Sequence, residues 1–185
     1  MPRTSKRIQL LEAAAAIVNE YGSEYLTLDA VAKRAGVSKG GLLYHFKTKA
    51  GLIQGLVEHA DKLYRDNVDE RVVSDTQPQG KWVRAFIEAT REHRSENAAI
   101  TSSMLAAEGN NRHLLTPLQD TYKSWQSYIE NDGLDKVDAT IMRLAVDGLW
   151  LSEIFGLDAI DESMREQILE RLTYYSKVTD NNAFS

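Results

Sequence analysis

Residues 27–49 read TLDAVAKRAGVSKGGLLYHFKTK, and this stretch decides the fold. Thr27 is a good N-cap residue, because its hydroxyl can accept a hydrogen bond from a free backbone N–H of the next helical turn. Apolar residues follow at helical spacing, and Gly36 stands where a left-handed residue would end the helix. Ser38 is a second N-cap before a short helix expected over Lys39–His45. Helix, a turn of about three or four residues containing Gly, and helix together predict a helix-turn-helix motif.

The second of these short helices has an unusual surface. Gly40 and Gly41 lie in its first turn, where they leave the backbone N–H groups accessible, and such a helix start attracts anions. The side chains around it are donors suited to phosphates and base edges: Ser38, Lys39, Tyr44, His45, Lys47 and Lys49. The alternative is that the two glycines form a plain loop and the lysines a solvated face. Because the capping, turn and charge signals agree in one window, we favour a nucleic-acid contact.

These residues resemble the DNA-binding region of TetR-family transcriptional repressors, over about residues 5–60. The family pattern T-x-x-x-[IV]-A-x-x-A-G-V-S-x-G-x-[IL]-Y-x-[HY]-F-x-x-K is satisfied throughout, except that Leu43 replaces its Tyr. Many members contact DNA with that aromatic residue; Leu43 can either touch a thymine methyl group or pack inward. The resemblance implies that DNA contacts come from Thr27, Ser38, Lys39, Gly40, Tyr44, His45 and Lys49.

The charge is distributed unevenly along the 185 residues. The whole chain carries a net charge of −5, but residues 1–49 hold eight Lys and Arg against four Asp and Glu. This part therefore carries +4 and the remainder −9, which is typical of a DNA-binding module joined to another domain. Arg3–Arg7 is either a basic arm that reaches the DNA or a frayed terminus.

Composition excludes several classes of protein. The absence of Cys rules out disulfides and thiolate metal sites, and no apolar run is long enough to span a membrane. With no signal peptide at Met1, we expect a cytoplasmic protein without a membrane partner. The four His lack the spacing of metal ligands, so we expect neither a metal nor a cofactor.

Helical periodicity recurs along the chain and predicts an all-α fold of about nine helices. The predicted division is a helix-turn-helix domain over 1–50 and a ligand-binding and dimerisation domain over 51–185, with a loop at Ser74–Gly80. Thr116 followed by Pro117 and Gln119 predicts a capping box. The expected helices are Ile8–Tyr21, Leu28–Ala35, Lys39–His45, Lys49–Val72, Lys81–Arg94, Glu96–Glu108, Pro117–Asn131, Val137–Leu157 and Glu162–Lys177. By the resemblance, Lys49–Val72 acts as a lever between the two domains.

The predicted ligand-binding and dimerisation domain is rich in aromatic residues and Met, which form either a core or a pocket. Stripes of this kind are core more often than ligand site, but large aromatics with polar tips also suit a pocket for an apolar or mixed small molecule. The resemblance implies such an effector pocket beside the long helix. The candidate ligand-binding residues are Trp82, Phe86, Met104, Tyr122, Trp125 and Met142.

The last two predicted helices carry more apolar surface than one buried stripe needs. The resemblance implies a homodimer joined by a four-helix bundle of these helices from both subunits, which predicts a near-palindromic operator. The candidate interface residues are Leu144, Gly148, Leu151, Phe155, Ile168, Leu172 and Tyr175.

Enzymatic function has little support in the sequence. There is no G-x-S-x-G nucleophile turn and no G-x-x-x-x-G-K-[ST] phosphate loop, so a hydrolase is a minor alternative. A ligand sensor that acts through a protein partner is another, against which the residues between Ser38 and Lys49 argue. We expect a ligand-responsive DNA-binding transcriptional regulator, chiefly a repressor released by a small hydrophobic or aromatic effector. The effector, the operator and an activator role stay open.

Overall fold

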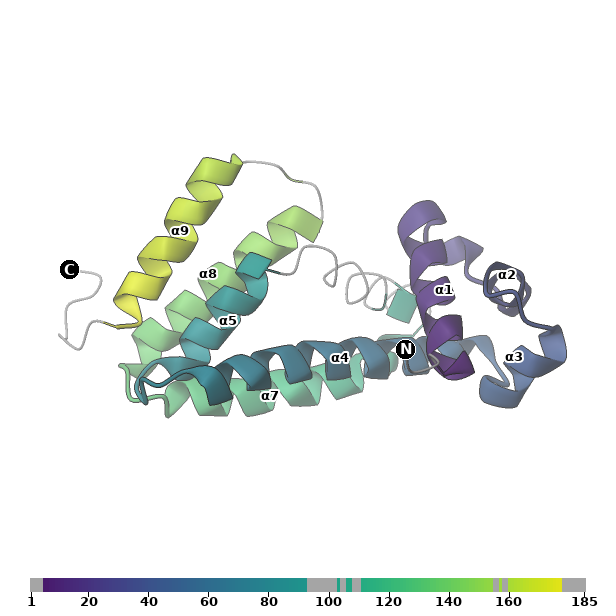
Figure 1. Cartoon of the computed structure of the whole chain (residues 1–185), viewed down its shortest axis with the longest axis horizontal. Helices are drawn as coiled ribbons and strands as arrows, with labels where there is room; N and C mark the ends of the chain where they lie inside the picture. The colour runs from purple at the N-terminus through teal and green to yellow at the C-terminus, as the bar shows by residue number, and fades with distance from the viewer. Residues whose placement is uncertain are drawn as a thin grey trace. The chain divides into compact units, whose positions relative to one another are not determined.

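The computed structural model describes residues 5–92, 103, 106–107, 111–154, 157 and 160–177. Within them the chain forms eight α-helices and two short 3-10 helices and contains no strand, which confirms the all-α prediction (Figure 1). Of the helix predicted over Glu96–Glu108, only residues 103, 106 and 107 are described, and each is helical.

The chain divides into two compact units, Met1–Leu63 with Ser95–Asp120 and Tyr64–Arg94 with Thr121–Ser185. Two of the three boundaries fall inside helices, since the long helix α4 and the later helix α7 each contribute residues to both units. The domain boundary predicted after residue 50 stays a prediction.

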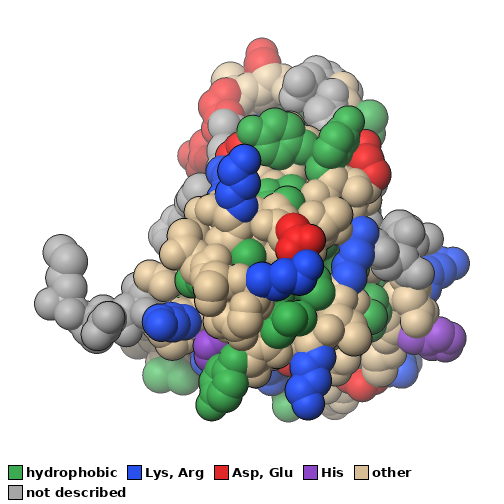
Figure 2. Space-filling view, turned by 90° about the vertical axis from the view of Figure 1, so that its right-hand side faces the viewer, with side chains coloured by type: hydrophobic (Ala, Val, Ile, Leu, Met, Phe, Trp, Pro, Cys, Tyr) green, Lys and Arg blue, Asp and Glu red, His purple; other side chains and the backbone are tan. Residues whose placement is uncertain are grey.

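The first unit begins with a helix bundle. Its elements are α1 (Lys6–Tyr21), the 3-10 helix η1 (Ser23–Tyr25), α2 (Leu28–Arg34), α3 (Lys39–His45) and the first half of α4 (Lys49–Ser74). Its core contains the fully buried side chains Leu10, Leu11, Leu26, Leu42, Leu52 and Ile53. On the face drawn in Figure 2, Lys and Arg side chains stand out from the surface at several places, with some Asp and Glu side chains among them.

A close contact joins α4 to the residue that follows α3. Gly55 lies against the ring of Phe46, so near that an added Cβ would stand 2.7 Å from the ring carbon Cε1. Arg7 lies beside the same contact, with its guanidinium 5.3 Å from the centre of the Phe46 ring and 3.7 Å from a Glu58 carboxylate oxygen. Arg7, which we considered as part of a DNA-reaching arm, therefore has partners within this unit. Arg3 lies outside the described residues.

The second unit packs the remaining helices around one hydrophobic core. After α4 come α5 (Lys81–Glu92), η2 (Arg112–Leu115), α7 (Thr116–Glu130), α8 (Lys136–Ile154) and α9 (Glu162–Tyr175), of which η2 and the start of α7 belong to the first unit. Helix α5 has its central residues Val83, Ala85, Phe86, Ile87 and Ala89 buried, and it packs against both α8 and α9.

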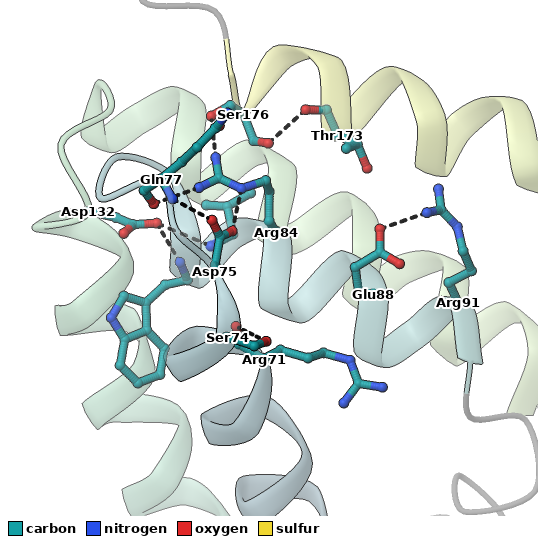
Figure 3. A network of polar contacts seen from close by, with 12 residues as sticks. Arg71, Ser74, Asp75, Gln77, Arg84, Glu88, Arg91, Asp132, Thr173 and Ser176 are labelled. Atoms are coloured by element: carbon teal, nitrogen blue, oxygen red, sulfur yellow. Dashed lines mark hydrogen bonds and ion pairs between the residues drawn. The ribbon is translucent and has the colours of Figure 1, made fainter.

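The start of α5 is the polar junction of this unit (Figure 3). Arg84 is buried, and its guanidinium pairs with Asp75 at 2.6 Å while donating to the carbonyl oxygens of Gln77 at 2.9 Å and Ser176 at 3.0 Å. One side chain therefore joins the loop after α4 to the end of α9. Gly80 has a φ of +74°, and an added Cβ would lie 2.3 Å from the Ser176 carbonyl oxygen, so only Gly fits there.

The N-terminus of α5 is capped from a distant loop. The carboxylate of Asp132, which follows α7, accepts hydrogen bonds from the backbone N–H groups of Trp82 at 2.8 Å and Val83 at 3.2 Å. These are donors that the helix itself cannot satisfy. The contact fixes the α7–α8 connection against α5.

The capping box predicted at Thr116 is wrong. The 3-10 helix η2 runs directly into α7, so Thr116 already has helical backbone angles, and its hydroxyl donates to the His113 carbonyl oxygen at 2.7 Å. The cap lies one element earlier, where Asn111 Oδ1 accepts from the His113 N–H at 3.0 Å. The sequence pattern was present, but the helix had already begun.

Candidate nucleic-acid interface and effector site

The helix-turn-helix motif forms through the local signals expected from its sequence. The Thr27 hydroxyl accepts from the Ala30 N–H at 3.1 Å, and the Ser38 hydroxyl accepts from the Gly41 N–H at 3.1 Å. Between them Gly36 takes a φ of +65°, in the left-handed region that favours glycine. These features begin α2 and α3 and form the turn between them.

Helix α3 is anchored on one side and open on the other. Leu42 and Phe46 are buried, while Tyr44 is 84% exposed and is flanked by exposed Ser38, Lys39 and Gly40. A Cβ added at Gly40 would have nothing within 4 Å, so another molecule can approach the backbone there. His45 lies edge-on to Tyr44 with ring centres 5.0 Å apart, and Lys49 begins α4 half-buried. Leu43, which the sequence allowed to face either way, is half-buried.

One acidic residue stands beside these predicted contacts. Lys39 Nζ lies 2.9 Å from Asp29 Oδ1 and 3.2 Å from Asp29 Oδ2, so the carboxylate of α2 holds the ammonium of α3 with both oxygens. Sequence reasoning missed Asp29. An acidic residue in the first turn of a helix is ordinarily explained by its favourable interaction with the helix dipole, so the sequence gives no sign of the contact with Lys39.

Three of the candidate ligand-binding residues meet in the second unit. Phe86 and Trp125 are buried with ring centres 4.8 Å apart, and Tyr122 lies 5.7 Å from Trp125. Tyr64 of α4 joins them 5.1 Å from Trp125, although the sequence showed it only as part of an apolar helix face. We call Tyr64, Phe86, Tyr122 and Trp125 the aromatic cluster.

The other candidates lie differently. Met142 is buried in the same hydrophobic core, and Trp82 stacks on Tyr128 with ring centres 4.5 Å apart. Met104 lies outside the described residues.

The aromatic cluster has a polar edge on α7 and α8. Arg143 and Asp147, one helical turn apart, form an ion pair whose side chains are largely buried. Arg143 Nε also donates to Gln126 Oε1 at 2.9 Å, and the guanidinium stands 6.0 Å from the centre of the Tyr122 ring. Arg and Asp four residues apart are typical of a solvated pair on a helix surface, so their spacing alone does not reveal this burial.

Burial governs the titration of these groups. It raises the pKa of Asp147, and the charge of Arg143 and a hydrogen bond with Tyr122 offset only part of that rise. Burial also raises the pKa of Tyr64 and Tyr122, so both hydroxyls stay protonated at neutral pH. An ion pair and two phenol hydroxyls therefore lie next to the apolar rings of the core.

Two models of known protein families match this chain, one in its N-terminal part and one in its C-terminal part. Residues 10–56 match the family model of bacterial regulatory proteins of the tetR family, and residues 80–177 match the tetracyclin repressor-like C-terminal domain. The second match alone covers more than half of the chain. The chain belongs to the TetR family.

Named relatives within the TetR family include regulators called BetI. The HTH-type transcriptional regulator BetI of Yersinia pestis (strain Pestoides F) is 31% identical over 112 residues, which are 58% of this chain and 55% of that protein. The chain thus matches about half the length of that relative. BetI of Pectobacterium carotovorum is 28% identical over 176 residues, 89% of this chain and 88% of that protein.

A solved structure shows the same TetR fold. The SmeT–triclosan complex has a TM-score of 0.69 and 20% identity, and the match covers 97% of this chain and 94% of SmeT. In the part of this TetR-family chain that the structure describes, none of the helices is both long and apolar enough to cross a membrane.

Helix α8 of this TetR-family chain is apolar on two sides. One side is buried in the core through Ala139, Met142, Val146 and Leu149. The other side is open and carries residues at helical spacing, which we call the α8 stripe: Val137, Ile141, Leu144, Gly148 and Leu151, with exposed fractions of 57%, 44%, 53% and 38% for the four large side chains.

The other candidate interface residues that the structure describes lie in the core or against it. Ile168 and Tyr175 of α9 are half-buried and pack against the core, and Leu172 is 6% exposed within it. Leu172 therefore offers a partner little surface, because its side chain is already used inside this chain. Phe155 lies outside the described residues.

Proposed function

We propose that this protein is a ligand-responsive transcriptional repressor that binds a near-palindromic operator as a homodimer in the cytoplasm. A small hydrophobic or aromatic effector releases it from the operator, and no catalysis is involved. The observation that carries the DNA-binding half is the open face of α3. Tyr44 is 84% exposed on a helix anchored by the fully buried Leu42, and it stands beside exposed Ser38, Lys39 and Gly40, so these groups are accessible to a duplex.

The residues proposed for DNA contact fall into two kinds. Lys39, Tyr44 and His45 project from α3 and can reach base edges, whereas Thr27, Ser38 and Lys49 cap or begin helices and are suited to phosphates. Gly40 lets the backbone approach the duplex. In a two-fold dimer the two α3 helices would read half-sites roughly 34–36 Å apart.

Operator binding can be tested with a duplex selected by the wild-type protein from a random-sequence pool. We expect Tyr44→Ala to weaken binding to that duplex by about 1–3 kcal/mol, roughly 5- to 150-fold, because a base-edge contact is lost. Lys49→Ala should weaken selected and scrambled duplexes alike and reduce the slope of log K against log salt by about one. Fluorescence anisotropy over a salt series measures both effects.

Tyr25→Ala is the matched control for this experiment. Tyr25 is also a strongly exposed Tyr of the first unit, at 60%, but it lies in η1 and outside the helix-turn-helix motif. Its loss should leave the affinity unchanged. Wild-type affinity in both Tyr44→Ala and Lys49→Ala would refute the assigned interface.

The aromatic cluster supports the effector half of the proposal. It combines apolar rings with the Arg143–Asp147 pair, and it lies partly on α4, the helix that also contributes to the DNA-binding unit. An effector that prefers one arrangement of α4 can therefore change the affinity for DNA. The fold is shared with SmeT, whose structure was solved with triclosan.

A thermal-shift screen of small aromatic compounds, run with and without the selected duplex, tests the effector. A ligand at about 100 times its Kd should stabilise the free protein by roughly 2.7 kcal/mol, and bound DNA should reduce that gain. Tyr122→Phe keeps the ring but removes the hydroxyl that bonds Asp147, and should weaken an effector that uses this edge. A ligand that stabilises both forms equally cannot be the inducer.

A further inference from the structure

The contact between Asp29 and Lys39 is not explained by the stability of the helix-turn-helix motif. Their side chains are 71% and 64% exposed, and an ion pair so exposed contributes at most about 1 kcal/mol. The packing of α2 and α3 is already secured by buried Val31, Ala32 and Leu42. The unit would fold without this carboxylate.

The carboxylate is also unfavourable for simple attraction to DNA. It places a negative charge on the surface proposed to face the phosphates, two residues after Thr27 and against the Lys39 ammonium. Removing it would strengthen non-specific binding, because that binding depends on net positive charge. Beyond its favourable interaction with the dipole of α2, Asp29 can therefore contribute through the contact that Lys39 makes.

The geometry of the Asp29–Lys39 pair indicates how Asp29 can act on the contact that Lys39 makes. Lys has a flexible four-carbon stem and a charge without directional preference, so a free Lys39 can settle on whichever phosphate is nearest. Asp29 holds the ammonium with both carboxylate oxygens and keeps it at the start of α3, where recognition helices contact base edges. An ammonium held there is placed to donate to the O6 and N7 acceptors of a guanine.

We propose that Asp29 is a positioning residue that directs Lys39 to a base and so exchanges affinity for sequence discrimination. This inference rests on the DNA-binding function proposed above. It assigns Asp29 no direct contact with DNA, and its effect requires Lys39.

The test compares wild type, Asp29→Asn, Lys39→Met and the double variant on the selected duplex and on a scrambled duplex of the same length. We expect Asp29→Asn to bind the scrambled duplex more tightly and to lower the ratio of the two affinities at least 5-fold. In the Lys39→Met background the same change should leave the ratio unaltered. Asp29→Glu, which retains the charge, should keep more of the wild-type affinity ratio than Asp29→Asn does.

Glu20→Gln is the matched control for charge removal. Glu20 also forms an ion pair within the first unit, with Arg34, but that pair joins α1 to α2 and does not involve α3. Glu20→Gln should change the affinities for the selected and the scrambled duplex by the same factor.

An unchanged ratio in Asp29→Asn would reduce Asp29 to a simple repulsive charge and overturn the inference. An equal loss of ratio in the Lys39→Met background would overturn it as well, because Asp29 would then act without Lys39. If the wild-type protein prefers no duplex at all, the proposed DNA-binding function fails first, and the two failures are thereby distinguished.

Discussion

Arg84→Met will lower the free energy of unfolding by about 3–5 kcal/mol, because breaking a buried ion pair leaves its partner charged and uncompensated. Asp75 would lose its cation, and the carbonyl oxygens of Gln77 and Ser176 would lose their donor. Urea denaturation at a fixed protomer concentration measures the effect.

The free energy of unfolding that Arg84→Met loses should depend on pH. Burial raises the pKa of Asp75, but the hydrogen bond and charge of Arg84, with the Gln77 N–H, lower it below the ordinary value of 3.8. A depressed pKa in the folded state contributes stability above the unfolded value and loses it as the pH falls through the folded one. The difference between wild type and Arg84→Met should therefore narrow as acid protonates Asp75, which happens at a lower pH in the wild type than in the variant.

Arg91→Met is the control on the same helix. Arg91 lies two turns after Arg84 on α5, and it pairs with Glu88 and Glu166, whose side chains are 35% and 42% exposed. Such partly solvated pairs contribute about 1 kcal/mol or less. Adding Asp75→Asn to Arg84→Met should recover part of the stability. Equal losses of stability in Arg84→Met and Arg91→Met would contradict the stabilising role assigned to Arg84 at the polar junction.

Replacing Leu144 and Leu151 together by Glu will convert the proposed dimer into a folded monomer. Both side chains belong to the α8 stripe and are 53% and 38% exposed, so charges there are solvated in the single chain. In a dimer they would be buried without partners, and the dissociation constant should rise by at least roughly 100-fold. Sedimentation or light scattering measures the mass, and circular dichroism checks the helices.

The same double variant should lose most of its affinity for the selected duplex, because two linked half-sites become two independent ones. Val73→Glu provides the control, since Val73 is an 86% exposed apolar residue on α4, outside the stripe. It should remain a dimer. If the Leu144→Glu, Leu151→Glu protein is still dimeric, the subunits meet elsewhere.

The sequence predicted the helix-turn-helix motif well because its signals are local. N-caps at Thr27 and Ser38 and the left-handed Gly36 each depend on residues no more than a few positions away, and the structure has all three. The failure at Thr116 has the same origin. A cap motif shows that a helix can begin there, but it does not show that a preceding turn has already begun it.

Local sequence signals could not predict the contacts between residues that are distant in the sequence. The capping of α5 by Asp132 spans about 50 residues, and the Arg84 bond to Ser176 spans 92. Likewise, Leu172 and Leu144 are both Leu at helical spacing, yet one is in the core and the other is on the surface. Periodicity identifies an apolar face, and only the packing of the whole unit decides what covers it.

Helix α4 limits how this protein can be divided or recombined. Leu52, Ile53 and Leu56 of α4 are among the fully buried side chains of the first unit, and that unit extends to Leu63. A fragment that stops at residue 50 therefore lacks part of its own interior. Grafting the head onto another body means splicing within a continuous helix. Each inserted or deleted residue there turns everything downstream by about 100°, so hybrid regulators must preserve the helical phase.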